Sequence, residues 1–172
     1  MNAISFVGDE QFLQNSTDWN MQYIEQFSQD HPDWNLRIYR TPAGLRIMVM
    51  HDVFQSSDPR VDNFFESVNT DPTYVWMCKR QECFRARVSP KPWRIGLEGG
   101  DAKLAQGVWP IQKGLVAERK KWVSLYEKAA VDFASCRYEK SLGSGTIHSK
   151  CERLRIVHDG YCKAEEPGLP LA

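Results

Sequence analysis

The 172-residue sequence contains no long apolar run, and this absence bears on its relation to membranes. A transmembrane helix needs roughly 18 to 20 consecutive apolar residues, and no stretch of the chain approaches that length. The N-terminal residues also lack the basic segment followed by an apolar segment that is typical of a secretion signal. We therefore expect neither a secretion signal nor a membrane span, and no membrane as a partner.

Net charge is also absent, because 22 Lys and Arg residues balance 22 Asp and Glu residues. A neutral protein is not expected to coat DNA through bulk charge, although a local basic patch can still bind phosphate. The charges are unevenly distributed along the sequence. Residues 1–36 contain acidic side chains and no Lys or Arg, whereas residues 79–94 contain six basic side chains and one acidic side chain, Glu82. This pattern predicts either a dipolar surface or ion pairs between the two segments.

Cysteine is sparse and odd in number. The five cysteines are scattered along a chain without a secretion signal, which is typical of reduced thiols in a cytoplasmic protein. Cys78 and Cys83 have no second pair of ligands at a zinc-like spacing, and Cys151 and Cys162 are too far apart in one expected helix to act as a local pair. The sequence therefore predicts no metal site and no cofactor.

A thiol or hydrolase site can be drawn from side chains near the C-terminus, but no surrounding motif supports it. Its members would be His148, His158 and Asp159 with either Cys136 or Cys151. We interpret His158 as an ordinary core or surface histidine on a helix.

Repeats of 20 to 50 residues and low-complexity tracts are absent, which excludes a solenoid and a long disordered tail. The chain is 42% hydrophobic and 26% charged, as an ordinary globular domain is. A chain of this length can bury a core without a disulfide or metal to stabilise it. We predict a single domain spanning residues 1–172.

The first half of the chain has clear local signals. Aromatic residues at three- and four-residue spacing predict an amphipathic helix over Thr17–Gln29 that ends near His31-Pro32. Leu36–Thr41 and Leu45–Met50 are strand-like runs separated by Pro42-Ala43-Gly44, and this order predicts a hairpin. Asp58-Pro59 is a helix start signal, and the helix is expected to extend to Val68.

The second half is expected to hold another strand pair, a loop and two helices. Thr73–Cys78 and Cys83–Val88 are rich in aromatic and β-branched residues, which predicts strands. Gly96–Gly114 is predicted to be a long surface loop, and Leu115–Lys140 and Ser149–Cys162 to be helices. We therefore expect an α+β fold. It would be a two-layer domain with a mainly antiparallel sheet of about four strands, an N-terminal helix and a C-terminal helical hairpin.

Strand alternation places several cationic side chains on one face of this expected sheet. That face would carry Tyr39 together with Arg37, Arg46, Arg85 and Arg87, and the Pro-rich segment at its edge would add Lys91 and Arg94. Guanidinium groups bind phosphate oxygens bidentately, and aromatic rings stack on bases. Our first hypothesis is therefore a non-catalytic binder of nucleic acid or nucleotide phosphates. Alternatively, acidic side chains of the N-terminal helix cover these arginines as ion pairs.

Two tryptophans in segments rich in Pro and Gly suggest a second hypothesis, a protein interaction module. Trp93 lies between Lys91 and Arg94 in a rigid Pro-rich segment, and Trp109 lies in the Gly-rich loop. Aromatic side chains held on rigid segments make effective partner contacts. The alternative is that Trp93 packs against its own domain.

Two segments resemble known proteins. Tyr39 to Val49, a match of 11 residues, resembles a hairpin of archaeal and eukaryotic primase-polymerases, where a Gly-x-His element faces the incoming nucleotide. Arg46 stands at the position of that histidine, and no Asp-x-Asp or Asp-x-Glu pair precedes it. The resemblance thus implies a phosphate-binding element without polymerase catalysis. Cys83 to Arg94, with the Gly143-Ser144-Gly145 turn, is similar to an uncharacterised group of bacterial proteins, and this similarity implies no function.

A third hypothesis is phosphoryl or nucleotidyl transfer with an external divalent metal. Arg85 and Arg87 would stabilise phosphoryl charge, and His148 would move a proton. The Gly143-Ser144-Gly145 turn would form an anion-binding nest, although the absence of the Gly-Lys-Ser/Thr ending of a Walker motif favours an interhelical turn. This site requires Arg87 and His148, about 60 residues apart in the sequence, to meet in space.

Overall fold

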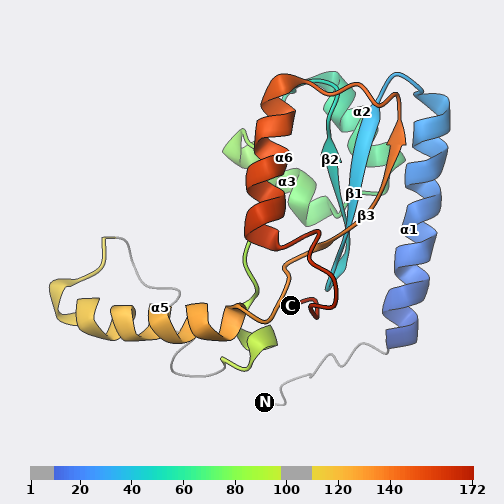
Figure 1. Cartoon of the computed structure of the whole chain (residues 1–172). Helices are drawn as coiled ribbons and strands as arrows, with labels where there is room; N and C mark the ends of the chain where they lie inside the picture. Colours follow the sequence, from blue (N-terminus) through green and yellow to red (C-terminus); the bar gives the residue numbers. More distant parts are fainter. Residues whose placement is uncertain (1–9, 98–109) are drawn as a thin grey trace, which may run out of the picture. The chain divides into compact units, whose positions relative to one another are not determined.

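The computed structural model describes residues 10–97 and 110–172, and the fold is α+β (Figure 1). By its internal contacts the chain divides into two compact units. Unit 1 comprises Met1–Ala86 and Tyr138–Ile156, and unit 2 comprises Arg87–Arg137 and Val157–Ala172. No helix within the described ranges is both long and apolar enough to cross a membrane. The expectation of a single domain stays a prediction.

Unit 1 begins with helix α1, Glu10–Asp30, which confirms the expected N-terminal helix but starts before Thr17. The helix ends just before His31-Pro32, because the residue that precedes a proline is disfavoured in the helical conformation. Ile24 and Phe27 are buried, whereas Trp19, at the other end of the aromatic series, is exposed. The core therefore receives only part of the predicted aromatic stripe.

The predicted hairpin is confirmed. Strands β1, Asn35–Thr41, and β2, Gly44–Val49, pair antiparallel with Leu36 opposite Val49 and Tyr39 opposite Arg46. In the turn, the hydroxyl of Thr41 accepts a hydrogen bond from the Ala43 amide at 3.3 Å. The turn chemistry and the alternation of apolar residues thus set the same register.

A third strand, β3 (Arg137–Gly143), completes an antiparallel sheet with the order β2-β1-β3. Near one end of the neighbouring strands β1 and β3, the Ser144 amide donates to the Trp34 carbonyl at 2.8 Å. Toward the other end, Arg40 of β1 forms an ion pair with Glu139 of β3 at 3.0 Å. We expected about four strands, and the described ranges contain three. The third strand comes from a segment that we expected to be helical.

Helices α2, Pro59–Ser67, and α3, Pro72–Gln81, have the same start signal. Asp58 caps α2 as predicted, with its carboxylate accepting from the Arg60 amide, and Asp71 caps α3 by accepting from the Thr73 amide. The strand predicted over Thr73–Cys78 is therefore wrong, because an N-cap aspartate followed by proline at the first helical position favours a helix over the local β propensity. Cys83–Val88, the second predicted strand of the pair, has no regular secondary structure.

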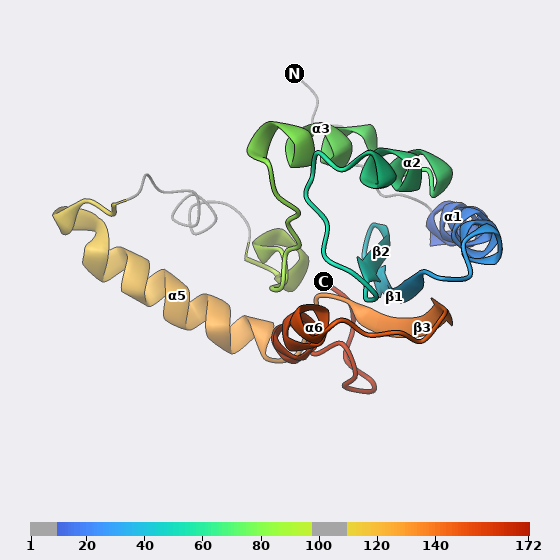
Figure 2. The same cartoon turned by 90° about the horizontal axis from the view of Figure 1, so that it is seen from above.

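The core of unit 1 is an aromatic cluster between the hairpin and helices α1, α2 and α3. The Trp34 ring stacks on Phe64, with centroids 5.3 Å apart, and Phe27 meets Trp34 edge to face at 5.0 Å. Leu36 and Ile38 of β1 are fully buried in the same cluster. Figure 2 shows α2 and α3 lying along one side of the hairpin. Buried side chains of these two helices belong to the same cluster as Leu36 and Ile38.

Unit 2 contains the short helices η1, Pro92–Ile95, and η2, Lys113–Leu115, helix α5, Val116–Ala130, and the end of helix α6, Ser149–Cys162. One apolar cluster of unit 2 is formed by Ile95, Leu97 and Ala172, with Tyr126, Ala129, Ala130 and Phe133 packed against them. The bounds of α6 match the sequence prediction.

The helix expected over Leu115–Lys140 ends at Ala130, so the predicted C-terminal helical hairpin is wrong. Beyond that point the Ala134 amide donates to the Pro170 carbonyl, and the Ser135 amide donates to the Cys162 carbonyl, each at 3.0 Å. These long-range hydrogen bonds replace the local ones that would have continued the helix. The chain consequently runs extended into β3 before α6 begins.

Candidate phosphate-binding site

The predicted arginine surface depended on a second strand pair, and the structure distributes its members differently. Arg85 and Arg87 lie in the non-regular segment after α3 and not on the sheet. Arg85 is exposed, and its Nε donates to the Cys83 thiol at 3.2 Å. Of the predicted arginines, the sheet therefore keeps Arg37 and Arg46.

Arg37 and Arg46, on the hairpin, are engaged within unit 1. The Arg37 Nε donates to the Tyr39 hydroxyl at 2.9 Å, and its guanidinium lies 3.8 Å from the centroid of the Tyr138 ring. Tyr39 itself is buried, and Arg46 opposite it is half-buried with an interaction of its own. A phosphate at this face would have to displace contacts that already hold the sheet together.

The basic Pro-rich segment, by contrast, is built as a compact turn in unit 2. Pro92 occupies the first position of η1, where its fixed φ is favourable and its missing amide proton costs nothing. The Arg94 amide donates to the Lys91 carbonyl at 2.9 Å. Gly96 takes a φ of +77°, which lets the Leu97 amide donate back to the Pro92 carbonyl at 2.9 Å. Backbone hydrogen bonds thus fix the positions from which Lys91 and Arg94 project.

The same turn is fastened to the core of unit 2. Ile95 is buried there, and the hydroxyl of Tyr126 on α5 donates to the Pro90 carbonyl at 2.7 Å. Tyr126 also packs against the apolar cluster of unit 2. Its hydrogen bond to a carbonyl 36 residues earlier left no sequence signal. The turn is therefore a rigid platform, which limits the entropy lost when a ligand binds.

Three cations and an aromatic ring gather on this platform. The Lys91 Nζ lies 5.1 Å from the centroid of the Trp93 ring, and the Arg87 Nε donates to the Ser89 carbonyl at 2.9 Å. Burial, with a further contribution from the neighbouring charges of Arg94 and Arg87, lowers the pKa of Lys91 below its ordinary value. The three positive charges therefore repel one another. An oxyanion placed among them would relieve this repulsion.

Two of the three cations of the platform are not neutralised by an ion pair. Within residues 10–97 and 110–172, no ion pair involves Lys91 or Arg94, whereas Arg87 has a further interaction of its own. Unit 2 carries eleven basic and eight acidic side chains, a net charge of +3, whereas unit 1 has a net charge of −3. The neutral chain thus conceals a basic unit that contains the three clustered cations.

Trp93 is 50% exposed, so a large part of its ring is available beside these cations. The structure therefore brings together four of the predicted residues, Arg87, Lys91, Trp93 and Arg94, and leaves Arg37, Arg46 and Arg85 elsewhere. Trp109 lies outside the described residues.

His148 lies just before α6 in unit 1 and forms hydrogen bonds with the backbone there. Its backbone amide donates to the Met50 carbonyl at 2.8 Å, and its Nδ1 accepts from the Lys150 amide at 3.2 Å. In the nearby turn, the Ser144 amide is already used by the Trp34 carbonyl. An amide that is bonded to a carbonyl is not free to bind an anion, which counts against the predicted nest. A catalytic role for His148 stays a prediction.

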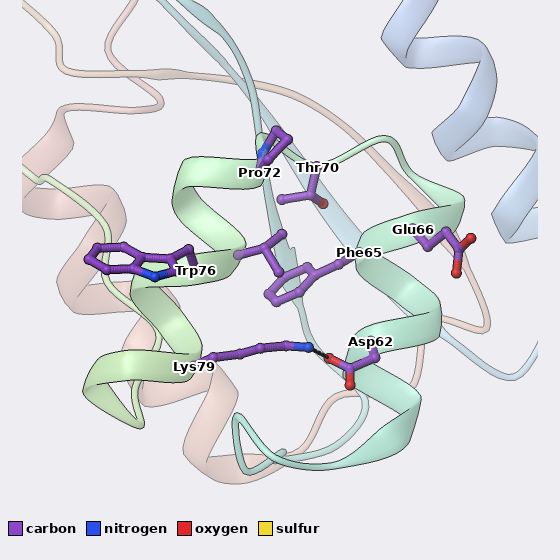
Figure 3. A pocket seen from close by; sticks show the side chains of 8 residues that line it. Asp62, Phe65, Glu66, Thr70, Pro72, Trp76 and Lys79 are labelled. Carbon is purple, nitrogen blue, oxygen red and sulfur yellow. Dashed lines mark ion pairs between the residues drawn. The ribbon is translucent and has the colours of Figure 1, made fainter.

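A concave feature lies between α2 and α3 (Figure 3). It is an open groove of about 440 Å³, lined by Asp62, Phe65, Glu66, Thr70, Pro72, Val75, Trp76 and Lys79. The ammonium of Lys79 and the carboxylate of Asp62 form an ion pair across it at 2.9 Å. Lys79 is the only cation among the lining residues that the structure describes, and this ion pair neutralises it. The groove is therefore a less favourable phosphate site than the platform in unit 2.

No family model, curated protein or solved structure matches this chain. The resemblances of the hairpin and of the Cys83 to Arg94 run therefore rest on those residues alone. The functional inference rests on the geometry and the charges described above.

Proposed function

We propose that unit 2 binds the phosphate groups of nucleic acid or nucleotides through Arg87, Lys91 and Arg94. The observation that carries this proposal is the gathering of three cations on one rigid turn, beside a half-exposed tryptophan. Phosphate contacts of this kind position a ligand without reading its sequence. Trp93 supplies a flat surface on which one base can stack, and such stacking tolerates any base.

Binding through phosphates has a definite dependence on salt. Each phosphate contact releases condensed counterions, so three contacts to a single strand give a log–log slope of about −2 against salt concentration. An increase from about 50 to 200 mM salt then weakens binding roughly 20-fold. Loss of two of the three cations reduces the same ratio to roughly threefold.

The test is the fluorescence anisotropy of a labelled single-stranded oligonucleotide titrated with the full chain across that salt range. The informative variant is Lys91→Ala with Arg94→Ala, because within the described residues neither side chain forms a hydrogen bond or an ion pair. The matched control is Lys120→Ala with Lys121→Ala, which removes the same charge from exposed positions of α5 in the same unit. We expect the platform variant to lose affinity and salt dependence, and the control to lose little of either.

Further outcomes test the site and its ligand. Absence of binding at low salt, or equal losses in the two double variants, would refute a specific site. Competition by a mononucleotide or by inorganic polyphosphate separates a nucleotide site from a site that needs a strand. Trp93→Ala should weaken oligonucleotide binding by about 1 to 3 kcal/mol and leave polyphosphate binding unchanged, because polyphosphate has no base to stack.

A further inference from the structure

Two thiols and an imidazole converge in the interior of unit 2. The His158 Nε2 lies 3.6 Å from the Cys162 Sγ and 4.0 Å from the Cys136 Sγ. One ligand-type atom from each residue lies within 4.8 Å of the other two. All three side chains are at most 3% exposed. This cluster is separate in its residues from the proposed phosphate platform.

The backbone holds the three side chains in this arrangement. His158 and Cys162 are four residues apart on α6, a spacing that places both on one face of the helix. Cys136 precedes β3, and the amide of its neighbour Ser135 donates to the Cys162 carbonyl at 3.0 Å. One hydrogen bond thus connects the two segments that carry the cluster, so the donor atoms are positioned by the fold.

The orientation of His158 is set by a carboxylate. Asp159 is buried, and its Oδ1 lies 2.9 Å from the His158 Nδ1. With the proton of the imidazole on Nδ1 and donated to this carboxylate, the lone pair of Nε2 faces the two sulfur atoms. A carboxylate that holds the far nitrogen of a histidine is the usual outer partner of a metal-bound imidazole.

Donor chemistry and spacing fit zinc. Two thiolates and one imidazole form a donor set that Zn²⁺ prefers, and bond lengths of about 2.3 and 2.0 Å place S and N about 3.6 Å apart around a tetrahedral ion. The two observed S···N distances, 3.6 and 4.0 Å, are close to that value. We infer that Cys136, His158 and Cys162 bind one zinc ion, with a fourth ligand from outside this cluster.

Burial distinguishes this assignment from a catalytic thiol. A nucleophilic cysteine must reach a substrate, whereas the Cys136 and Cys162 side chains are fully buried. A structural ion also suits the unit, because it comprises only 67 residues, and small folding units commonly depend on a metal or disulfide. Zinc would tie the end of α6 to the segment that leads into β3, and its binding energy would contribute to folding.

The primary experiment measures zinc per chain in the full-length protein purified under reducing conditions from zinc-supplemented culture. We expect about one equivalent, which a thiol-reactive reagent releases. Addition of cobalt to the chelator-treated protein should give the thiolate charge-transfer and d–d absorption bands of a tetrahedral site. Removal of zinc should lower the Tm, and its return should restore the Tm.

Variants test the assignment of ligands. Cys136→Ser and Cys162→Ser should bind less than about a tenth of an equivalent, whereas Cys151→Ser should keep the full amount. Cys151 is a suitable control because it is also buried and also lies on α6, but its thiol donates to the Asp52 carbonyl at 3.3 Å. Asp159→Asn retains all three ligands and should weaken zinc binding about 10- to 100-fold by disturbing the histidine.

Several results would overturn the inference. They are a trace of zinc only, with no cobalt spectrum and no thermal response in the wild-type protein, or full zinc content in both ligand variants. A third is a mass two daltons below the reduced value with a peptide map that joins Cys136 to Cys162, which would identify a disulfide. If either serine variant fails to fold, the wild-type cobalt spectrum and the affinity of Asp159→Asn still decide the question.

Discussion

Alanine at position 143 should destabilise unit 1 strongly. Gly143 ends β3 with a φ of +98°, a conformation that residues with a Cβ rarely adopt. A Cβ at this position would lie 1.9 Å from the Trp34 carbonyl oxygen and 3.0 Å from the carbonyl carbon. An ordinary nonbonded contact is about 3.5 Å, and the obstructing atoms belong to the backbone, so a side-chain rotation cannot remove the clash.

Three costs set the magnitude of this effect. A positive φ for alanine costs about 1 to 2 kcal/mol, and the shift of packed backbone that relieves the clash costs about 1 to 3 kcal/mol. That shift also strains the hydrogen bond from the Ser144 amide to the Trp34 carbonyl, now 2.8 Å long, at a cost of about 1 kcal/mol. The expected loss in the free energy of unfolding is therefore roughly 3 to 6 kcal/mol.

Gly145→Ala is the matched control, two residues further along the chain. Gly145 has a φ of +72°, but a Cβ added there would meet nothing within 4 Å. Only the conformational cost remains, so the expected loss is about 1 to 2 kcal/mol. The difference between the two variants therefore isolates the close approach of Gly143 to the Trp34 carbonyl.

Urea unfolding followed by far-UV circular dichroism measures both variants, with hydrogen exchange of the Ser144 amide as a local probe. The wild-type protein supplies the reference midpoint and m-value. A loss for Gly143→Ala within about 1 kcal/mol of the loss for Gly145→Ala would refute the steric reasoning. Unchanged protection of the Ser144 amide in Gly143→Ala would refute it as well.

Two further predictions concern a helix cap and a histidine of unit 1. Asp71→Ala should cost about 1 kcal/mol in urea unfolding, because it removes the cap on the Thr73 amide, and no loss would show that the cap is unnecessary. Burial lowers the pKa of His51 below its usual 6.5, against the opposing effect of nearby carboxylates, and its Nδ1 accepts from the Asn35 amide at 3.1 Å. The unfolded chain binds the proton first, so the stabilisation is complete above about pH 6.5 and is lost as the pH falls through the lowered pKa. Unfolding free energies measured across this range should show that decline in the wild-type protein and a smaller one in His51→Gln, and identical profiles would contradict it.

Elements with local signals were predictable from the sequence. The hairpin has two alternating strands and a Pro and Gly turn within 16 residues, and α2 begins at an aspartate followed by proline. The same start signal was present at Asp71-Pro72, but the aromatic and β-branched residues that follow favoured a strand. Capping and packing against the aromatic core made this segment a helix. The local preference of these residues for a strand is thus outweighed by capping and by packing in the folded protein.

The candidate functional residues also divide into those that the sequence could bring together and those that it could not. Lys91, Trp93 and Arg94 lie within four residues of one another, so a single turn gathers them wherever that turn is placed. The predicted union of Arg37 with Arg85 instead required a strand pair that the described chain does not form.

The hairpin, the bounds of α6 and the basic turn could be predicted from the sequence, because each depends on neighbours a few residues apart. The position of β3 after α5 depends instead on long-range contacts, since the hydrogen bonds that end the helix come from residues near the C-terminus. Long-range contacts also bring Cys136 to His158 and Cys162. The i, i+4 pair on α6 was visible in the sequence, but its third member is 22 residues from His158. The separation of two residues along the sequence does not reveal whether they meet in space. Only the folded backbone therefore shows which distant side chain completes such a cluster.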